Sequence, residues 1–453
     1  MRTHAVTSWL ILAVAVSAVA CAREESSNDL SDPVEATRLE QEIALLEELG
    51  YVSASRRAGE FSNVTVYDSL RASPGLNLYV SGHAPEAILM DMEGRVLHRW
   101  RNDSKILARR RVGLDPLLEN VLTKSERRYW RRVHLALNGD LLAIHSLYSL
   151  IKLDRDSNLL WEYPKRVHHD FEVLADGTIY VLVADSRRLI RINPERDVEE
   201  DFVAILAPDG RELRRVSLLE AIENAGLNDL VAMLPVEGDL LHTNSLRVLD
   251  GRFAGRNPAF RAGNVLVSFL TLNTIAVVDL DAEEVVWSLQ GSFRFQHDPR
   301  LVDDGSILLF DNLGPALRGK RLDRHPGSLK KLWYGYIFGL AKLDAPASAV
   351  LEIDPETGEV LWSYEGTSVA PFNSVHLGAS HRLPNGNTLI VESEPGRVFE
   401  VTPIGEIVWE FVSPHRLGDL VAHVFDLVRI PPDFPVDWAQ QQPGRPPRVP
   451  VGN

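Results

Sequence analysis

One strand-turn-strand phrase occurs six times in this chain, and this repetition constrains the fold more than any other feature of the sequence. Each copy has an alternating apolar strand, a turn rich in Asp, Pro, Glu or Gly, and a second strand that usually ends at Trp. This pattern is typical of a β-hairpin. The copies are AILMDMEGRVLHRW (87–100), LIKLDRDSNLLWEY (150–163), VAILAPDGRELRRV (203–216), IAVVDLDAEEVVWSL (275–289), AVLEIDPETGEVLWSY (349–364) and VFEVTPIGEIVWEF (398–411).

A second phrase precedes each hairpin, usually with an Asn-Gly or Asp-Gly turn between two strands. Its copies are LNLYVSG (76–82), HLALNGDLLAIH (134–145), HDFEVLADGTIYVL (169–182), HTNSLRVLDG with GNVLVSFL (242–270), HDPRLVDDGSILLF (297–310) and SHRLPNGNTLIVE (380–392). The two phrases together supply about four antiparallel strands, which is one propeller blade. We therefore predict an all-β fold: a six-bladed β-propeller over residues 61–435, with helical insertions and a short N-terminal helix.

The ring of blades needs a closing strand and leaves room for insertions. The strand at about His423–Ile430 has no hairpin partner in sequence, so we expect it to pair with Leu76–Val80 and remove the open edges. The Trp residues are expected to anchor the packing of blades. The insertions are a basic helical segment at 101–133, a helix from the capping box Ser217-x-x-Glu220 to about Met233, and a long loop at 314–346.

The N-terminal residues 1–20 read as a signal peptide. Their apolar run is too short to cross a bilayer as a helix but suits secretion. Small residues precede Cys21, which resembles the lipidated first residue of a bacterial lipoprotein, although plain cleavage near Ala20 fits as well. Residues 21–60 then form a polar tether with a short helix, and residues 436–453 form a Pro-rich tail. We predict an exported protein, in the periplasm or anchored to the membrane through a lipid on Cys21.

Composition and motifs exclude several kinds of site. Lys plus Arg is 48 and Asp plus Glu is 63, so the net charge of 48 − 63 = −15 argues against nucleic acid as a partner. A single cysteine excludes an internal disulfide and a Cys-cluster zinc site. The sequence also has no phosphate-binding loop, dinucleotide fingerprint, HExxH motif or GxSxG motif.

Several histidines occupy similar places at the start of the second phrase. His169 and His297 each precede an aspartate and lie eight residues before the glycine of the turn, while His242 lies nine before Gly251. His134 and His381 lie five residues before their turn glycines, and His376 lies just upstream of His381. Because repeats make such positions neighbours around an axis, we expect these imidazoles to converge at one mouth of the channel. The histidines at 4, 83, 98, 325 and 415 are exposed or have no clear place in this pattern.

The phrases HHDFEVLADG, LHTNS, FQHDPRLVDDGSILLFDN and LPNGNTLIVES…GRVFEVTPIGEIVWEF resemble the bacterial arylsulfotransferases, over about residues 75–430. The resemblance implies an exported six-bladed propeller that moves a sulfuryl group from a phenolic sulfate to a phenol. Such enzymes need no cofactor and no nucleotide sulfate donor (PAPS), because a histidine carries the group in a ping-pong cycle. A neutral imidazole suits this role, since it splits one difficult transfer into two easier ones.

The resemblance also implies site residues. It places His297 of QHD, and His242 with Asn244 of HTNS, in the site, with His169 as a further substrate-binding residue. We predict His381 as the nucleophile, with His376 as its competitor. Pro299 stands where family members often have Asn, and ASAVLEID stands where some have Arg, so Arg318 or Arg382 is the predicted sulfate-binding cation.

Two other functions remain open at this stage. One is a non-catalytic cell-surface propeller that binds a ligand or acts as a scaffold. The other is a metal-dependent hydrolase with His169, His242 and His297 and either Asp170 or Asp298 as ligands, since imidazole and carboxylate suit zinc or iron. For the arylsulfotransferase function, we predict small aromatic sulfates and phenols as partners, and no metal ligands.

Overall fold

Each predicted pair of phrases forms one antiparallel sheet in the computed structural model, which describes residues 53–102, 129–317, 348–368 and 370–439. All described residues belong to the unit Leu46–Asn453. The predicted signal peptide, Cys21, the N-terminal helix, Arg318 and most of the 101–133 and 314–346 insertions lie outside the described residues, so they stay predictions. Of the predicted tether, Arg56–Arg57 forms strand β1.

Three sheets contain mainly strands from the first half of the chain. The first consists of β29 (Val424–Ile430), β3 (Leu76–Ser81), β4 (Glu86–Met90) and β5 (Val96–Arg101). The second consists of β6 (Trp130–Leu135), β7 (Leu141–His145), β8 (Ser149–Leu153) and β9 (Leu159–Tyr163). The third consists of β10 (Val167–Val173), β11 (Ile179–Arg187), β12 (Val198–Leu206) and β13 (Glu212–Ser217), with β14 (Gly238–Asp239) parallel to β12.

Three further sheets follow. One consists of β15 (Thr243–Val248), β16 (Val265–Phe269), β17 (Thr274–Asp279) and β18 (Glu284–Leu289). The next consists of β19 (His297–Leu301), β20 (Ile307–Asp311), β21 (Ala349–Ile353) and β22 (Val360–Glu365). The last consists of β23 (Ala379–Arg382), β24 (Thr388–Glu392), β25 (Arg397–Val401), β26 (Ile407–Val412) and β2 (Asn63–Tyr67). A small extra sheet pairs β1 with β28 (Leu420–Val421) and β27 (Arg416–Leu417).

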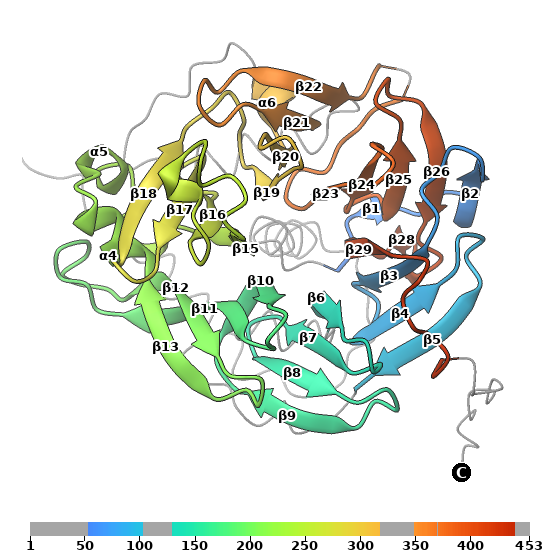
Figure 1. Ribbon diagram of the computed structural model, residues 1–453, viewed down its shortest axis with the longest axis horizontal. Coiled ribbons are helices and arrows are strands. Elements are labelled where there is room, and N and C mark those ends of the chain that lie inside the picture. Colours follow the sequence, from blue (N-terminus) through green and yellow to red (C-terminus); the bar gives the residue numbers. More distant parts are fainter. Residues whose placement is uncertain (1–52, 103–128, 318–347, 369, 440–453) are drawn as a thin grey trace, which may run out of the picture. The chain divides into compact units, whose positions relative to one another are not determined.

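The sheets follow one another around a central axis (Figure 1). Their innermost strands are β29, β6, β10, β15, β19 and β23, and each of these sheets contacts the next one in this order, with the last contacting the first. The chain is therefore a β-propeller. The predicted closure is confirmed, because β29 pairs with β3 from Val424↔Ser81 to Ile430↔Leu76.

The turns and tryptophans behave as predicted from the repeat. The backbone of Gly177 and Gly305 has φ of 85° and 84°, a left-handed conformation that glycine adopts without steric cost. Trp100 and Trp409 are fully buried, and their indole nitrogens donate to the carbonyls of Gly139 and Met92 in the turns of the neighbouring sheets. Each such tryptophan joins two sheets by apolar packing and one hydrogen bond.

The structure corrects two predicted helices. The segment predicted as helical at 101–133 begins at the end of β5 and ends within β6, so its described residues at the C-terminal end are a strand. The capping box is confirmed, because Ser217 accepts a hydrogen bond from the backbone of Glu220, but the helix does not reach Met233. It breaks into α4 (Leu218–Asn224) and α5 (Asn228–Val231) at Gly226, whose φ is 67°.

Short helical turns complete the described structure. They are α6 (Gly314–Leu317) and the 3₁₀ turn η2 (Pro258–Phe260). Of the predicted tail, Trp438 packs on the first sheet, with its ring centroid 5.6 Å from that of Trp100. Among the described residues, no helix combines the length and the apolar character that a membrane span requires.

Candidate active site

Five of the six inner strands carry a β-bulge or register irregularity, and β23 is the exception. A bulge inserts unpaired residues into one strand and so redirects side chains that a regular strand would point into the sheet. The register shifts lie between Trp130 and Val133, Val167 and Phe171, Thr243 and Ser245, His297 and Arg300, and Val424 and Asp426. Pro299 fits its bulge, where a strand needs no ladder N–H.

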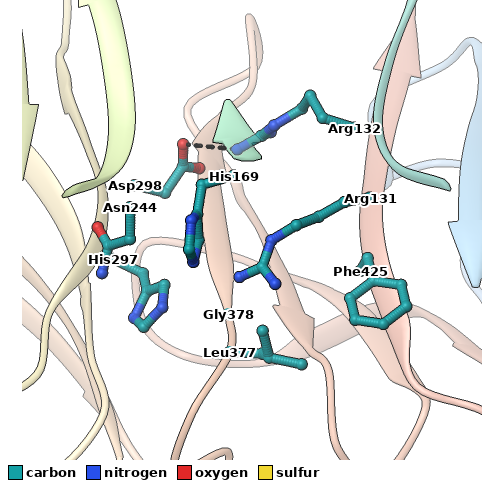
Figure 2. A pocket seen from close by; sticks show the side chains of 9 residues that line it. All are labelled: Arg131, Arg132, His169, Asn244, His297, Asp298, Leu377, Gly378 and Phe425. Carbon is teal, nitrogen blue, oxygen red and sulfur yellow. Dashed lines mark hydrogen bonds and ion pairs between the residues drawn. The ribbon is translucent and has the colours of Figure 1, made fainter. Parts of the chain in front are cut away.

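The residues of these bulges line a pocket on the axis (Figure 2). Figure 2 shows the guanidinium of Arg131 between the imidazoles of His169 and His297 on one side and the ring of Phe425 on the other. The lining residues are Arg131, Arg132, His169, Asn244, His297, Asp298, Leu377, Gly378 and Phe425.

His297 is held in one tautomer. Its Nδ1 lies 2.8 Å from the side-chain oxygen of Asn312 and 3.0 Å from the carbonyl oxygen of Phe295, so Nδ1 carries the proton. Burial lowers the pKa of His297 to about 3, and the hydrogen bond to Asn312 does not offset this effect. The ring is therefore neutral, and its Nε2 presents a lone pair without a hydrogen-bond partner among the described residues.

His169 and His242 contact each other but differ in charge. Their ring centroids are 4.7 Å apart with the planes at 72°. Burial holds the pKa of His169 well below its ordinary value, and the charges of Arg131 and His242 act in the same direction. Burial alone would lower the pKa of His242, but the charge of Asp239 and a 2.7 Å hydrogen bond to it outweigh burial and raise that pKa. His169 is thus neutral beside a more basic His242.

His376 has a carboxylate partner. Its Nδ1 and its backbone N–H both lie 2.9 Å from Oε1 of Glu394, and its Nε2 has no hydrogen-bond partner among the described residues. Burial would raise the pKa of Glu394, but His376 and Arg56 outweigh burial and hold that pKa at about 2. The ionised carboxylate therefore fixes the proton on Nδ1 of His376.

Asn312 connects His376 to the pocket. While its oxygen binds His297, its nitrogen donates to the carbonyls of Ser374 and Leu377, at 2.6 and 3.0 Å. These two residues flank His376, and Leu377 itself lines the pocket. The turn that carries His376 is therefore attached to the same amide that orients His297.

A set of buried ion pairs together with His381, here called the axial charge ring, adjoins the pocket and shares Arg132 and Asp298 with its lining. Each inner strand supplies at least one member: Asp426, Arg132, Asp170, Arg247, Asp298 with Arg300, and His381. Arg132 lies 2.9 Å from Asp426 and 3.0 Å from Asp170. Arg247 pairs with Asp170 and Asp298, Arg300 lies 3.0 Å from Asp298, and His381 lies 3.7 Å from Asp426.

The structure brings together only some of the predicted site residues. His169, Asn244 and His297 line the pocket, and His242 packs on His169. His381, the predicted nucleophile, belongs to the axial charge ring instead, and burial with the nearby Arg300 lowers its pKa.

Arg382, a predicted sulfate-binding cation, does not line the pocket. It pairs with Glu352 and lies 5.1 Å from the Trp362 ring centroid. Arg382 is thus engaged on the outer side of its strand, because side chains alternate along β23.

The sequence analysis missed Arg131 and Arg132. A usable signal existed, because Arg131 lies eight residues before Gly139, just as His169 and His297 lie eight before Gly177 and Gly305. The prediction of a helix at 101–133 obscures this equivalence, because it places Arg131 outside the strands. Phe425 and Leu377 gave no comparable signal, since apolar residues occur throughout the strands.

The metal-site prediction is not supported by the geometry. Asp170 and Asp298 are paired with arginines of the axial charge ring, so neither of the two predicted carboxylate ligands is free to join the pocket histidines.

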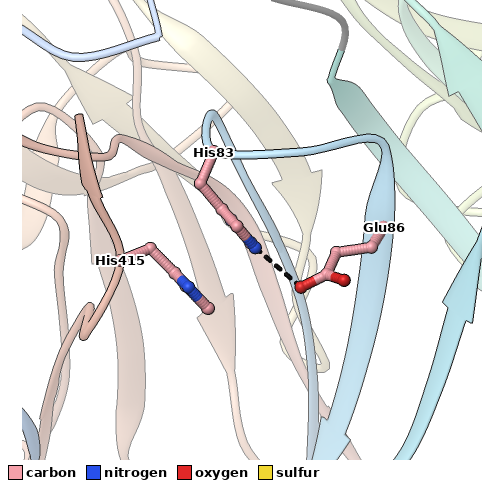
Figure 3. Close-up of side chains that lie close together, drawn as sticks. All are labelled: His83, Glu86 and His415. Atoms are coloured by element: carbon pink, nitrogen blue, oxygen red, sulfur yellow. Dashed lines mark hydrogen bonds and ion pairs between the residues drawn. The ribbon is translucent and has the colours of Figure 1, made fainter. Parts of the chain in front are cut away.

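Among the described residues, one group of three could hold a metal: His83, Glu86 and His415 (Figure 3). The rings of these two histidines, left unassigned from sequence, are stacked with planes at 3° and centroids 3.4 Å apart. Stacked rings cannot both aim in-plane lone pairs at one ion, and Glu86 already binds His83 at 2.6 Å and Arg99 at 2.9 Å. This group is better described as a hydrogen-bonded cluster.

The chain matches a known protein family and is similar to several solved structures. The sequence model of the Arylsulfotransferase (ASST) family matches residues 138–414, more than half of the chain. No curated protein matches the chain. A protein of unknown function from Bacteroides caccae is 11% identical with a TM-score of 0.45, over 77% of this chain and 97% of that one. A streptogramin B lyase is 10% identical with a TM-score of 0.41, over 80% of this chain and 86% of that one. The WD40 β-propeller domain of Doa1 is 12% identical with a TM-score of 0.40, over 83% of this chain and 95% of that one.

Proposed function

Because the chain belongs to the arylsulfotransferase family, we propose that it transfers a sulfuryl group from an aryl sulfate to a phenol through a sulfo-histidine on His376. The observation that carries this assignment is the His376–Glu394 pair, whose turn Asn312 attaches to a pocket that contains Arg131 and neutral histidines. The carboxylate of Glu394 stabilises the positive charge that develops on His376 during the attack, whereas the ring of His297 has only neutral oxygens as partners.

In the first half of the reaction, the lone pair on Nε2 of His376 attacks sulfur. The bond between sulfur and the aryl oxygen breaks, and its electron pair leaves with that oxygen. The imidazole becomes positively charged, and Glu394 stabilises this charge through Nδ1–H. Arg131 stabilises the negative charge on the sulfuryl oxygens, which is the role of preorganised donors in acyl and phosphoryl transfer.

In the second half, a phenol occupies the place of the released aryl oxide. Nε2 of neutral His297 accepts a hydrogen bond from the phenolic O–H and orients it, and the aromatic ring packs against Phe425 and Leu377. The phenol loses its proton to Nε2 of His169 and its oxygen attacks sulfur, so the S–N bond breaks and its electron pair returns to His376. The negative charge of the whole chain does not oppose anion binding, because the local field comes from Arg131.

The test is to trap the intermediate. We expect the protein incubated with p-nitrophenyl sulfate to gain about 80 Da, the mass of one SO₃ group, on the peptide that contains His376 and ends in Leu377. Chymotryptic cleavage after Leu377 separates His376 from His381. His376→Asn should abolish the adduct, whereas His381→Asn should retain it if the protein stays folded.

Two results would contradict the proposal at different levels. An adduct on His297 or His381 would overturn the choice of nucleophile while leaving sulfuryl transfer intact. A wild-type protein that forms no adduct with p-nitrophenyl sulfate or phenyl sulfate, and releases no phenol from them, would instead favour a propeller that only binds a ligand.

A further inference from the structure

A second histidine stands behind the pocket and has no part in the mechanism above. His168 is 3% exposed, and its Nδ1 lies 2.9 Å from Nδ1 of His169. His169 lines the pocket, and its Nε2 has no hydrogen-bond partner among the described residues. The two rings therefore form a path from the pocket into the interior of the third sheet.

The backbone creates this contact. Adjacent residues of a regular strand point to opposite faces, so two neighbouring histidines would not meet. His169 has φ of 52°, a left-handed conformation that is strained for a non-glycine residue. The bulge in β10 imposes this conformation, and the rings of His168 and His169 meet edge to face with planes at 84°.

The path ends at a buried carboxylate. Oδ1 of Asp201, on β12, lies 3.3 Å from Nε2 of His168, an ion-pair distance rather than an aligned hydrogen bond. The other oxygen of Asp201 accepts a hydrogen bond from the backbone N–H of Thr243 at 2.7 Å. Asp201 is 2% exposed, so its charge acts at short range in a medium of low dielectric constant.

We propose that Asp201 and His168 form a proton relay behind His169, which supplies a proton to the departing aryl oxide and recovers it from the acceptor phenol. This inference rests on the proposed function and adds the route of the proton to it. His168 and Asp201 act through His169 and are positioning residues.

The protons balance over the cycle. Before transfer, Nε2 of His169 carries a proton, and His168 and Asp201 hold two protons between them, one on Nδ1 of His168 and one between its Nε2 and the carboxylate. As the S–O bond breaks, His169 gives its Nε2 proton to the aryl oxide, and the proton on Nδ1 of His168 moves to Nδ1 of His169. In the second half, the acceptor phenol returns one proton to Nε2 of His169, and the Nδ1 proton moves back to His168.

The relay places positive charge where it is favourable. A proton that stayed as charge on His169 would be close to Arg131 and His242, and these charges, after burial, lower the pKa of His169. The same charge on His168 faces the Asp201 carboxylate. The relay thus lets a neutral His169 exchange protons with substrates beside a cationic sulfuryl site.

The test uses two donors that differ in their need for a proton. The p-nitrophenolate ion is stable without protonation, whereas the phenolate released from phenyl sulfate is a strong base. For His168→Asn and for Asp201→Asn, we expect adduct formation on His376 from phenyl sulfate to slow about 100-fold, a typical contribution of general acid catalysis. With p-nitrophenyl sulfate the same variants should stay within about threefold of wild type.

Controls separate this role from a structural one. His134→Asn removes a half-buried histidine on β6 that does not line the pocket, and it should leave both rates unchanged. Asp201→Asn keeps an oxygen for the N–H of Thr243, so it tests the relay even if His168→Asn fails to fold. Equal slowing with both donors, or no slowing with phenyl sulfate, would overturn the relay alone. Absence of any adduct on the wild-type protein would overturn the proposed function and the relay with it.

Discussion

The side-chain oxygen of Asn312 lies 2.8 Å from Nδ1 of His297, while the nitrogen of the same amide lies 2.6 Å from the carbonyl oxygen of Ser374. One side chain thereby sets the tautomer of a pocket histidine and holds the turn before His376. Asn312 is the last residue of the LFDN phrase, so this phrase has a physical role that its sequence did not disclose.

Asn312→Ala should weaken both the fold and the transfer. It removes three buried hydrogen bonds, and the carbonyls of Ser374 and Leu377 each keep only a serine hydroxyl as donor, so we expect a loss of about 2–4 kcal/mol in the free energy of unfolding. Urea denaturation measures this loss. Asn385→Ala, at an exposed turn, is the control and should change stability by less than about 0.5 kcal/mol. Equal effects of the two variants would contradict the role of Asn312.

Arg131→Gln should slow formation of the sulfo adduct about 100- to 1000-fold, as the loss of one preorganised donor does elsewhere. The same change should raise the pKa values of His169 and His297, because the Arg131 charge lowers both. Kinetics of the adduct and NMR titration of the histidine ring protons measure the two effects. Arg99→Gln, outside the pocket, should alter neither.

Asp298→Asn should be strongly destabilising, because Asp298 receives three arginines of the axial charge ring and is 2% exposed. Breaking a buried ion pair from one side costs about 3–5 kcal/mol, since the remaining charges stay buried. Asp303→Asn is the matched control, because its pair with Arg252 is at the surface and should contribute less than about 1 kcal/mol. A similar small loss for both variants would show that the ring contributes little.

Asp311→Asn should change how stability depends on pH. Burial raises the pKa of Asp311 to about 7, although hydrogen bonds from the backbone N–H groups of Arg294 and Gly314 act to lower it. The folded protein therefore binds this proton more tightly than the unfolded chain does. Its stabilising contribution is complete below the unfolded pKa of 3.8 and is lost as the pH rises through about 7. The melting temperature of the variant relative to wild type should therefore rise from about pH 5 to about pH 8. A pH-independent difference would be inconsistent with this titration.

Much of the architecture was predictable because the strands and turns of a propeller follow from local sequence patterns. The hairpin phrases, the glycine turns and the closing strand all follow from alternation and turn chemistry, which act over a few residues. The convergence of His169, Asn244 and His297 also followed, since equivalent positions of repeats are neighbours around an axis.

Local sequence patterns could not decide which histidine is the nucleophile. His381 and His376 are five residues apart on one strand and its preceding turn, yet one faces Asp426 in the axial charge ring and the other binds Glu394. Similarly, Arg131 reaches the pocket only because a bulge in β6 redirects it.

The sequence by itself determined the repeats, their strands and the family, because backbone pattern and turn residues are local properties. Only the tertiary structure decided which side chains face the pocket and which protonation states they hold. A bulge reverses the direction of a side chain, and the pKa of a buried imidazole depends on charges such as Arg131, Asp239 and Glu394 that are distant in sequence.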